Sequence, residues 1–178
     1  MRNTNNKTNI LVINAFLSMF SLLSVAFDKM LSAMIPIPFF RLEFSDIPAY
    51  VSIMMFGDFK SGMLIIIIVS FLRAVFFSIA GWVGFIMRAL SVILIFFLFL
   101  HCKCKERFSF FLILGTLLYV IAKVPFSMLL WVHVNRIPIL FFRKIIPCIV
   151  ISNILRIILN YFLSIYVYKL IMKAKNTH

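Results

Sequence analysis

The sequence predicts an all-α integral membrane protein, a bundle of six transmembrane helices. Of its 178 residues, 64% are apolar and only 13% are charged, whereas a soluble domain keeps about a quarter of its residues charged. The apolar residues come in long runs, and the mean hydropathy of the chain is +1.13. Runs of about 20 apolar residues suit a helix that crosses a bilayer. No polar stretch is long enough for a soluble domain, so we expect residues 1–178 to form a single transmembrane domain.

Six apolar segments are expected to be helical, and the second is too short to cross a membrane by itself. The expected helices are Ile10–Leu31, Ile47–Phe56, Lys60–Ile79, Val83–Leu100, Phe108–Trp131 and Ile146–Ile171. A helix rises 1.5 Å per residue, so the second would be about 15 Å long, half of the roughly 30 Å hydrocarbon thickness. We therefore expect this helix to be tilted, or packed among its neighbours.

An irregular segment, Met34–Asp46, separates the first two helices. Pro36 and Pro38 exclude a helix interior there, because proline lacks the N–H that a helix needs and clashes with the preceding turn. Irregular backbone at membrane depth is tolerated only where it is buried in protein or lines a cavity. The stretch Phe39–Asp46 is therefore a candidate cavity wall in an irregular outer loop.

The chain is strongly basic, with a formal net charge of +13, but its charge pattern does not favour nucleic acid. The basic residues are scattered between apolar spans, which is typical of residues that anchor a protein to anionic lipid and set its topology. With the N-terminus inside, the cytoplasmic segments carry nine Lys and Arg and the outer segments carry five. This bias predicts that both termini are cytoplasmic and that the lipid bilayer is the partner of the basic residues.

Nothing in the sequence predicts an enzyme. The chain has five carboxylates, no two of which share a span, and it has no motif for a nucleophile, a phosphate loop or a metal. Cys102 and Cys104 lie beside His101, but without a second ligand pair we interpret them as reduced thiols at a helix end. We therefore expect no catalytic residues, no metal and no cofactor.

Four basic residues lie inside the predicted helices: Arg73, Arg88, Lys123 and Arg156. An ionised side chain in a span is costly and usually faces the bundle interior or a water-filled cavity. In the predicted topology all four lie at the midplane or in the outer half of the membrane. An outward-facing polar pocket would account for the four together, and its positive charge would favour a ligand with anionic or electron-rich oxygens.

Two alternatives to this pocket are open. The basic side chains could extend outward to the membrane surface, or they could pair with Asp28, Glu43 and Asp46 in the first outer loop.

Trp82 lies between glycines that allow close approach, so it could stack on a planar ligand. Its other interpretation is an aromatic side chain at the membrane interface.

The segment from Phe40 to Pro48, which reads F-R-L-E-F-S-D-I-P, resembles the signature between helices 1 and 2 of riboflavin-type S components of energy-coupling factor (ECF) transporters. The run of Ser70 to Arg73 and the turn from Gly81 to Met87 are similar to the third helix, the glycine turn and the start of the fourth helix in that family. Six helices and an Ile-Pro pair, Ile146-Pro147, before the last helix also match. The resemblance covers most of the chain.

The resemblance implies a substrate-binding membrane subunit in a bacterial plasma membrane. Such a subunit captures a vitamin on the outer side and associates with a transmembrane coupling subunit and two cytoplasmic ATPase subunits, which power uptake. In the family the coupling subunit docks on an Ala-x-x-x-Ala face of helix 1. The corresponding stretch here is Asn14–Met19, in which the second small position becomes Ser18 or Met19, so the motif is degraded. Ala15, Ser18 and Ser21 are small residues that would still allow close helix packing.

Riboflavin is the ligand that the resemblance favours, and two departures leave other ligands open. Arg88 occupies the position after the helix 4 methionine where the family usually has asparagine. At the start of the last helix the family usually has Pro-Phe-Asn, whereas this chain has Pro147-Cys148-Ile149, and the nearest amide side chain is that of Asn153. A relative that binds pantothenate, hydroxymethylpyrimidine, pyridoxine or another anionic or phosphorylated precursor is the first alternative. A membrane protein outside transport, such as an immunity or assembly factor, is the second.

Overall fold

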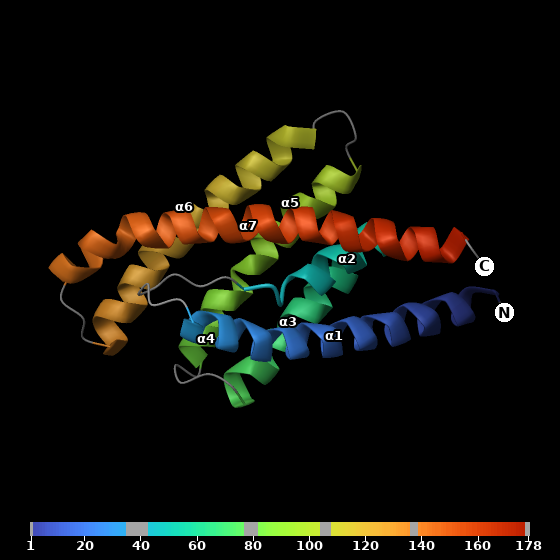
Figure 1. Cartoon of the computed structure of the whole chain (residues 1–178), viewed down its shortest axis with the longest axis horizontal. Helices are drawn as coiled ribbons and strands as arrows, with labels where there is room; N and C mark the ends of the chain where they lie inside the picture. Colours follow the sequence, from blue (N-terminus) through green and yellow to red (C-terminus); the bar gives the residue numbers. More distant parts are fainter. Residues whose placement is uncertain (1, 35–42, 77–81, 104–107, 136–138, 177–178) are drawn as a thin grey trace.

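The protein is a bundle of helices (Figure 1). The computed structural model describes residues 2–34, 43–76, 82–103, 108–135 and 139–176. Its helices are α1 (Arg2–Met34), α2 (Ile47–Phe56), α3 (Phe59–Phe76), α4 (Trp82–Ala89), α5 (Ser91–Lys103), α6 (Phe108–Asn135) and α7 (Ile139–Asn176). The described parts of the six apolar segments expected to be helical are helical apart from the turn at Leu90, so the predicted all-α class is confirmed for the described residues.

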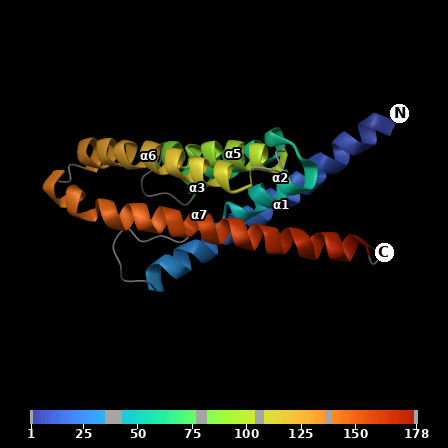
Figure 2. The same ribbon diagram turned by 90° about the horizontal axis from the view of Figure 1, so that it is seen from above.

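Six apolar helical segments are available to occupy a membrane. Three are long enough to cross it: Thr8–Leu31, Phe59–Phe76 and Arg143–Ala174. The shorter ones are Ile47–Phe56, Ser91–Leu100 and Ile113–Leu129. The start of α1 and the end of α7 lie at the same end of the bundle in two perpendicular views (Figures 1 and 2).

One predicted helix, Val83–Leu100, is divided into α4 and α5 at Leu90. At the break the amide of Leu90 still donates to the carbonyl of Ile86 at 3.3 Å, while the amide of Ile93 donates to Leu90 at 3.0 Å, only three residues back. Neither glycine nor proline marks this position, so the sequence pattern did not predict the break. Arg88, near the end of α4, forms an ion pair of the charged cluster described below, and Ser91, at the start of α5, contacts Arg156 of the same cluster.

The last two helices extend further than predicted although each contains a proline. α6 continues to Asn135 with Pro125 inside it, and α7 begins at Ile139 with Pro147 inside it. The predicted end of one helix at Trp131 and start of the next at Ile146 were therefore wrong. Prolines are tolerated within membrane helices because neighbouring helices and local adjustments compensate for the missing hydrogen bond.

Large apolar side chains cover the outside of the bundle, the reverse of a soluble protein. Leu23, Met30 and Phe76 are 67%, 68% and 72% exposed. Polar side chains are instead buried at many positions, and one buried pair joins two helices: the Ser52 hydroxyl of α2 donates to Asn14 Oδ1 of α1 at 2.8 Å. Such hydrogen bonds between helices hold membrane bundles together where the hydrophobic effect gives no driving force.

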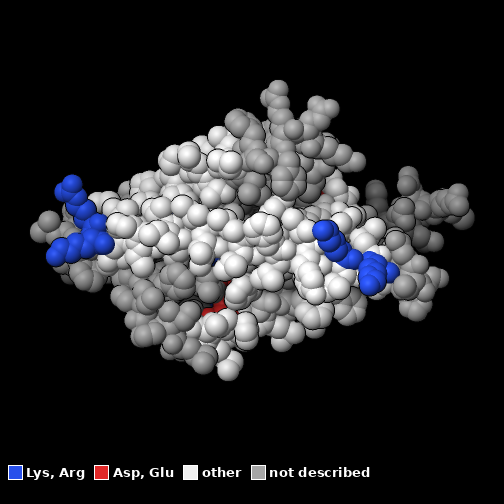
Figure 3. All heavy atoms as spheres, turned by 45° about the horizontal axis from the view of Figure 1, so that its top comes forward, with Lys and Arg blue, Asp and Glu red and all other residues white. Residues whose placement is uncertain are grey.

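Basic side chains lie at the two ends of the molecule. Figure 3 shows Lys and Arg gathered at opposite ends of one face, with few charged atoms on the described surface between them. On α7 the exposed basic residues are Arg143 and Lys144 near its start and Lys169 and Lys173 near its end. A helix rises about 37 Å over the interval from Lys144 to Lys169, slightly more than the hydrocarbon thickness. These residues are therefore spaced to lie at the two membrane surfaces.

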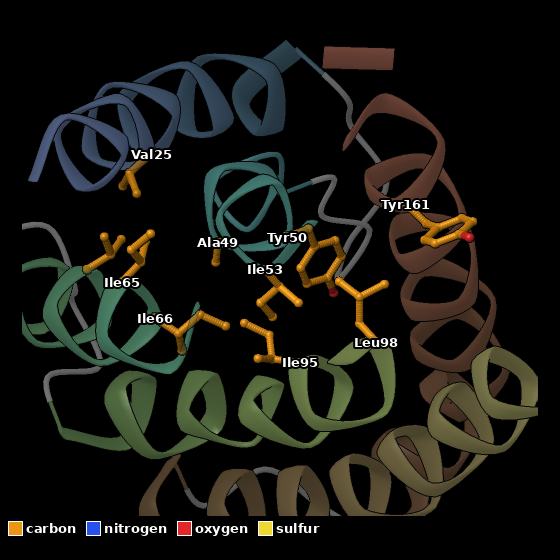
Figure 4. Packing of buried hydrophobic residues seen from close by; sticks show 10 residues of the cluster. Val25, Ala49, Tyr50, Ile53, Ile65, Ile66, Ile95, Leu98 and Tyr161 are labelled. Carbon is orange, nitrogen blue, oxygen red and sulfur yellow. The ribbon is translucent and has the colours of Figure 1, made fainter. Parts of the chain in front are cut away.

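The short helix α2 is packed among its neighbours, which is one of the two arrangements predicted for it. It contacts α1, α3, α5 and α7, and Figure 4 shows it surrounded by other helices, with apolar side chains filling the space around it. Ala49 and Ile53 of α2 are completely buried, as are Ile65 of α3 and Ile95 of α5. α2 thus occupies the centre of the core, and the residues just before it lie inside the bundle.

Gly57 ends α2 in a left-handed conformation, with φ of 61°, and its N–H donates to the Ile53 carbonyl at 2.8 Å. A β-carbon at Gly57 would meet nothing within 4 Å. We therefore expect Gly57→Ala to cost about 1 kcal/mol through backbone conformation alone, and Gly57→Asn to cost less because asparagine adopts this conformation more readily. Unfolding in a denaturing-detergent titration measures both values. Equal costs for the two variants would contradict the left-handed cap.

Candidate functional site

The segment just before α2 carries two carboxylates and is held in place by neighbouring helices. The Asp28 carboxylate of α1 accepts the backbone N–H of Phe44 at 2.8 Å and that of Ser45 at 3.4 Å. From α7, the Asn160 amide donates to the Glu43 carbonyl oxygen at 2.7 Å. These contacts engage three polar groups of the segment's backbone. The side chains of Glu43 and Asp46 are left to interact with other helices.

Three arginines from three different helices form ion pairs with these two carboxylates. The ion-pair distances are 2.9 Å for Arg73–Glu43, 2.5 Å for Arg156–Glu43, 2.8 Å for Arg88–Asp46 and 3.5 Å for Arg156–Asp46. Arg156 contacts both carboxylates, so it joins the pairs into one network. We call these five residues, together with Lys123, Tyr119 and Asn153, the charged cluster.

Lys123 of α6 enters the charged cluster through neutral partners. Its ammonium donates to the Tyr119 hydroxyl at 2.8 Å and to Asn153 Oδ1 at 2.7 Å. The Tyr119 hydroxyl also accepts a hydrogen bond from Arg156 at 2.7 Å, and the guanidinium of Arg156 lies 5.7 Å from the centre of the tyrosine ring. Tyr119 is completely buried. It therefore connects the lysine to the arginine network.

The structure brings together seven of the eight residues that the sequence suggested for a binding site. Glu43, Asp46, Arg73, Arg88, Lys123, Asn153 and Arg156 all contribute to the charged cluster. The side chain of the eighth, Trp82, lies outside the described residues, as do the side chains of His101, Cys102 and Cys104. The four cations face the interior. Pairing with Glu43 or Asp46, one of the predicted alternatives, is found for the three arginines and not for Lys123.

Sequence reasoning missed Tyr119, Ser91 and Asn160. Tyr119 lies four residues before Lys123, and Asn160 lies four residues after Arg156, so each pair shares one face of its helix. A polar residue one turn from a charged residue in an apolar helix was therefore the signal that could have found them. Ser91, whose hydroxyl lies 3.5 Å from Arg156, comes three residues after Arg88 in the same predicted helix and had the same signal.

The residues considered for docking a coupling subunit do not share one exposed face. Ala15 is exposed, but Ser18 is 7% exposed and Ser21 is fully buried. The Ser18 hydroxyl donates to the carbonyl of Asn14, and the Ser21 hydroxyl donates to the carbonyl of Ser45. Only Ala15 of the three is therefore available on the outside of α1, beside apolar residues such as Phe16 and Met19.

The cluster is close to the surface at one side. The side chains of Arg73 and Glu43 keep 18% and 14% of their surface exposed, whereas those of Arg88, Asp46 and Arg156 keep 6% or less. Figure 3 shows acidic atoms at the bottom of a recess in the molecular surface. Charged groups are thus almost completely desolvated in the interior, with Glu43 and Arg73 nearer to solvent.

Glu43 makes the stability of this cluster dependent on pH. Burial alone would raise the pKa of Glu43, but the guanidiniums of Arg73 and Arg156 outweigh burial and hold the pKa well below its ordinary value. An unfolded glutamate has a pKa of about 4.3. The stabilisation from Glu43 is therefore fully present above about pH 4.3 and is lost as the pH falls through the lower pKa of the folded state.

We expect the free energy of unfolding to fall below about pH 4.3 in the natural protein and to fall less steeply in Glu43→Gln, which has no carboxylate to protonate. Unfolding titrations between pH 7 and pH 3 measure both slopes. Asp58→Asn is the matched control, because Asp58 is exposed at the turn after α2. The same slope in Glu43→Gln as in the natural protein would contradict the expectation.

The helices and the charged cluster define a class: an all-α, multi-pass membrane protein with a buried polar site at the start of a central short helix. Its architecture is similar to the S component of a bacterial ECF transporter, with a TM-score of 0.64 over 94% of this chain and 97% of that chain. The two sequences are 21% identical, so the likeness establishes the fold. No family model and no curated protein sequence matches the chain. The predicted S-component fold is confirmed.

Proposed function

We propose that this protein is the substrate-binding subunit of an ECF-type importer and that it captures a vitamin or vitamin precursor at the charged cluster. The observation that carries the proposal is the cluster itself. Charged side chains from α3, α4, α6 and α7 meet the Glu43–Asp46 segment inside a membrane bundle, where ionised groups are costly and commonly mark a substrate site. The likeness in fold to an S component supports the same function.

Transport would proceed in the orientation that the basic residues predict. Both termini would lie in the cytoplasm of a bacterial cell, and the substrate would enter from the outer side of the plasma membrane. A transmembrane coupling subunit and two cytoplasmic ATPase subunits would power uptake. The position of both chain ends at one end of the bundle supports an even number of crossings (Figure 2).

The experiment that tests this proposal is a search for the ligand. The full chain is purified in a mild detergent and unfolded, and released small molecules are identified by mass spectrometry. Thermal-shift binding is then measured with riboflavin, pantothenate, hydroxymethylpyrimidine and pyridoxine, with riboflavin first because of the resemblance over residues 40–48. We expect one compound to be released or to stabilise the protein. No released compound and no stabilisation by any of the four would overturn the proposal.

A matched pair of variants places the site. Arg88→Ala is expected to weaken binding of the identified compound at least tenfold, because Arg88 is buried in the cluster. Lys60→Ala is the control, since Lys60 is exposed at the start of α3. Circular dichroism establishes that both variants are folded. Equal affinities of the two variants would move the site away from the cluster.

A further inference from the structure

The charged cluster contains more positive than negative charge. The four cations Arg73, Arg88, Lys123 and Arg156 face two carboxylates, those of Glu43 and Asp46. Asp28 is the next acidic residue, and its two oxygens accept backbone N–H groups of the segment before α2. Positive charge is therefore in excess by two, or by one when Asp28 is included. Buried charge without a counter-charge costs several kcal/mol.

Lys123 accounts for much of this excess. Its partners, Tyr119 and Asn153, are neutral, and no ion pair among the described residues includes it. Of the two remaining acidic residues, Asp58 is exposed at the turn after α2, where it accepts the Lys60 N–H, and Glu106 lies outside the described residues. Within the described part of the chain, no carboxylate is left to neutralise Lys123.

Several polar atoms of the cluster, and one of Asn160 beside it, are buried and make no hydrogen bond to any described residue, although Oδ2 of Asp46 keeps its 3.5 Å ion-pair contact with Arg156. Among donors these are Nε and Nη1 of Arg88 and Nε of Arg156; among acceptors they are Oδ2 of Asp46 and Oδ1 of Asn160. Arg88 and Arg156 are only 7% and 5% exposed. Buried donors without an acceptor cost about 1–3 kcal/mol each, and more when they are charged. These atoms are placed to bind a ligand with acceptor and donor groups.

We infer that the ligand of this site carries an anionic group, a carboxylate or a phosphate, and at least one hydroxyl or N–H group. The anionic group would accept hydrogen bonds from Arg88 and Arg156 and would offset the charge of Lys123, because charge-assisted hydrogen bonds are the strong ones. The hydroxyl or N–H would donate to Asp46 or Asn160. This inference rests on the proposed function and selects, among its candidate ligands, those with a negative charge.

Matched pairs of compounds test the charge requirement. In each pair only the anionic group differs: riboflavin against riboflavin 5′-phosphate, panthenol against pantothenate, and pyridoxine against pyridoxine 5′-phosphate. Affinities are measured by isothermal titration calorimetry with the full chain in a nonionic detergent. We expect the anionic member of the pair that binds to bind at least tenfold more tightly than its neutral partner.

Two variants connect the preference to the cluster. Lys123→Met removes one charge without leaving a carboxylate unpaired, so it is the variant most apt to fold. It is expected to reduce the affinity for the anionic member at least tenfold and to change that for the neutral member less than threefold. Arg88→Gln is the second variant, with the same expectation. Lys169→Met, an exposed charge on α7, is expected to change neither affinity.

The outcomes are distinct. Equal or tighter binding of the neutral member, or an equal loss for both members in Lys123→Met, overturns the anionic inference and leaves the proposed function intact. No binding by any member of the three pairs overturns the anionic inference, and it overturns the proposed function only when hydroxymethylpyrimidine also fails to bind and no compound is released from the purified protein. An anionic lipid headgroup would offer the same chemistry, so the titration is repeated in phosphatidylcholine nanodiscs with and without phosphatidylglycerol. A tenfold loss of affinity caused by phosphatidylglycerol would assign the site to lipid and also overturn the inference.

Discussion

Replacing Arg156 with methionine is expected to destabilise the protein by about 3–5 kcal/mol. Arg156 is 5% exposed and forms ion pairs with both Glu43 and Asp46. It also donates to the Tyr119 hydroxyl. Methionine fills a similar volume, so the loss would arise from two buried carboxylates that are left with fewer partners. A denaturing-detergent titration of the purified protein measures the free energy of unfolding.

Lys169→Met is the matched control for this prediction because it makes the same substitution of a long cation on the same helix. Lys169 is exposed near the end of α7, and exposed substitutions usually change stability by less than about 0.5 kcal/mol. Similar losses in the two variants would show that the ion pairs of Arg156 do not stabilise the fold. Loss of ligand binding in Arg156→Met at unchanged stability would instead assign Arg156 to the ligand alone.

The fold could be predicted largely from hydropathy because a bilayer imposes a simple requirement. Each spanning segment needs a long apolar run, and such runs are visible in any sequence. The predictions that were wrong concerned helix ends, which tertiary contacts determine. Pro147 lies inside α7, and α4 ends at Ala89 without a glycine or proline to mark the break. Local rules that hold for water-exposed helices predicted neither feature.

The residues of the site could be predicted from the free-energy cost of placing a charge in an apolar helix. Which cation pairs with which carboxylate could not be predicted. Arg73, Arg88, Lys123 and Arg156 were identified because a charge in an apolar helix requires a compensating interaction. Which cation meets which carboxylate depends on how the segment before α2 enters the bundle. The contact between Arg156 and Glu43 joins residues 113 positions apart. No periodicity in a single sequence encodes such a contact.

The ion pair between Arg88 and Asp46 makes a second prediction of comparable size. Its 2.8 Å contact is almost completely desolvated, so Asp46→Asn and Arg88→Gln are each expected to cost about 3–5 kcal/mol by leaving the partner charge unpaired. The double variant leaves neither charge, and its cost should fall short of the sum of the single costs by about 2 kcal/mol or more. Unfolding titrations of the four proteins give this coupling energy.

The expected coupling is large but incomplete, because each residue has another partner. Arg88 also donates to the Ser45 hydroxyl at 2.8 Å, and Asp46 lies 3.5 Å from Arg156. A second cycle, which combines Arg88→Gln with Asp58→Asn, is the control. Asp58 follows α2 whereas Asp46 precedes it, and a ten-residue helix of about 15 Å separates them, so these costs should add within about 0.5 kcal/mol. Additive costs in the first cycle would mean that Arg88 and Asp46 do not form a stabilising pair.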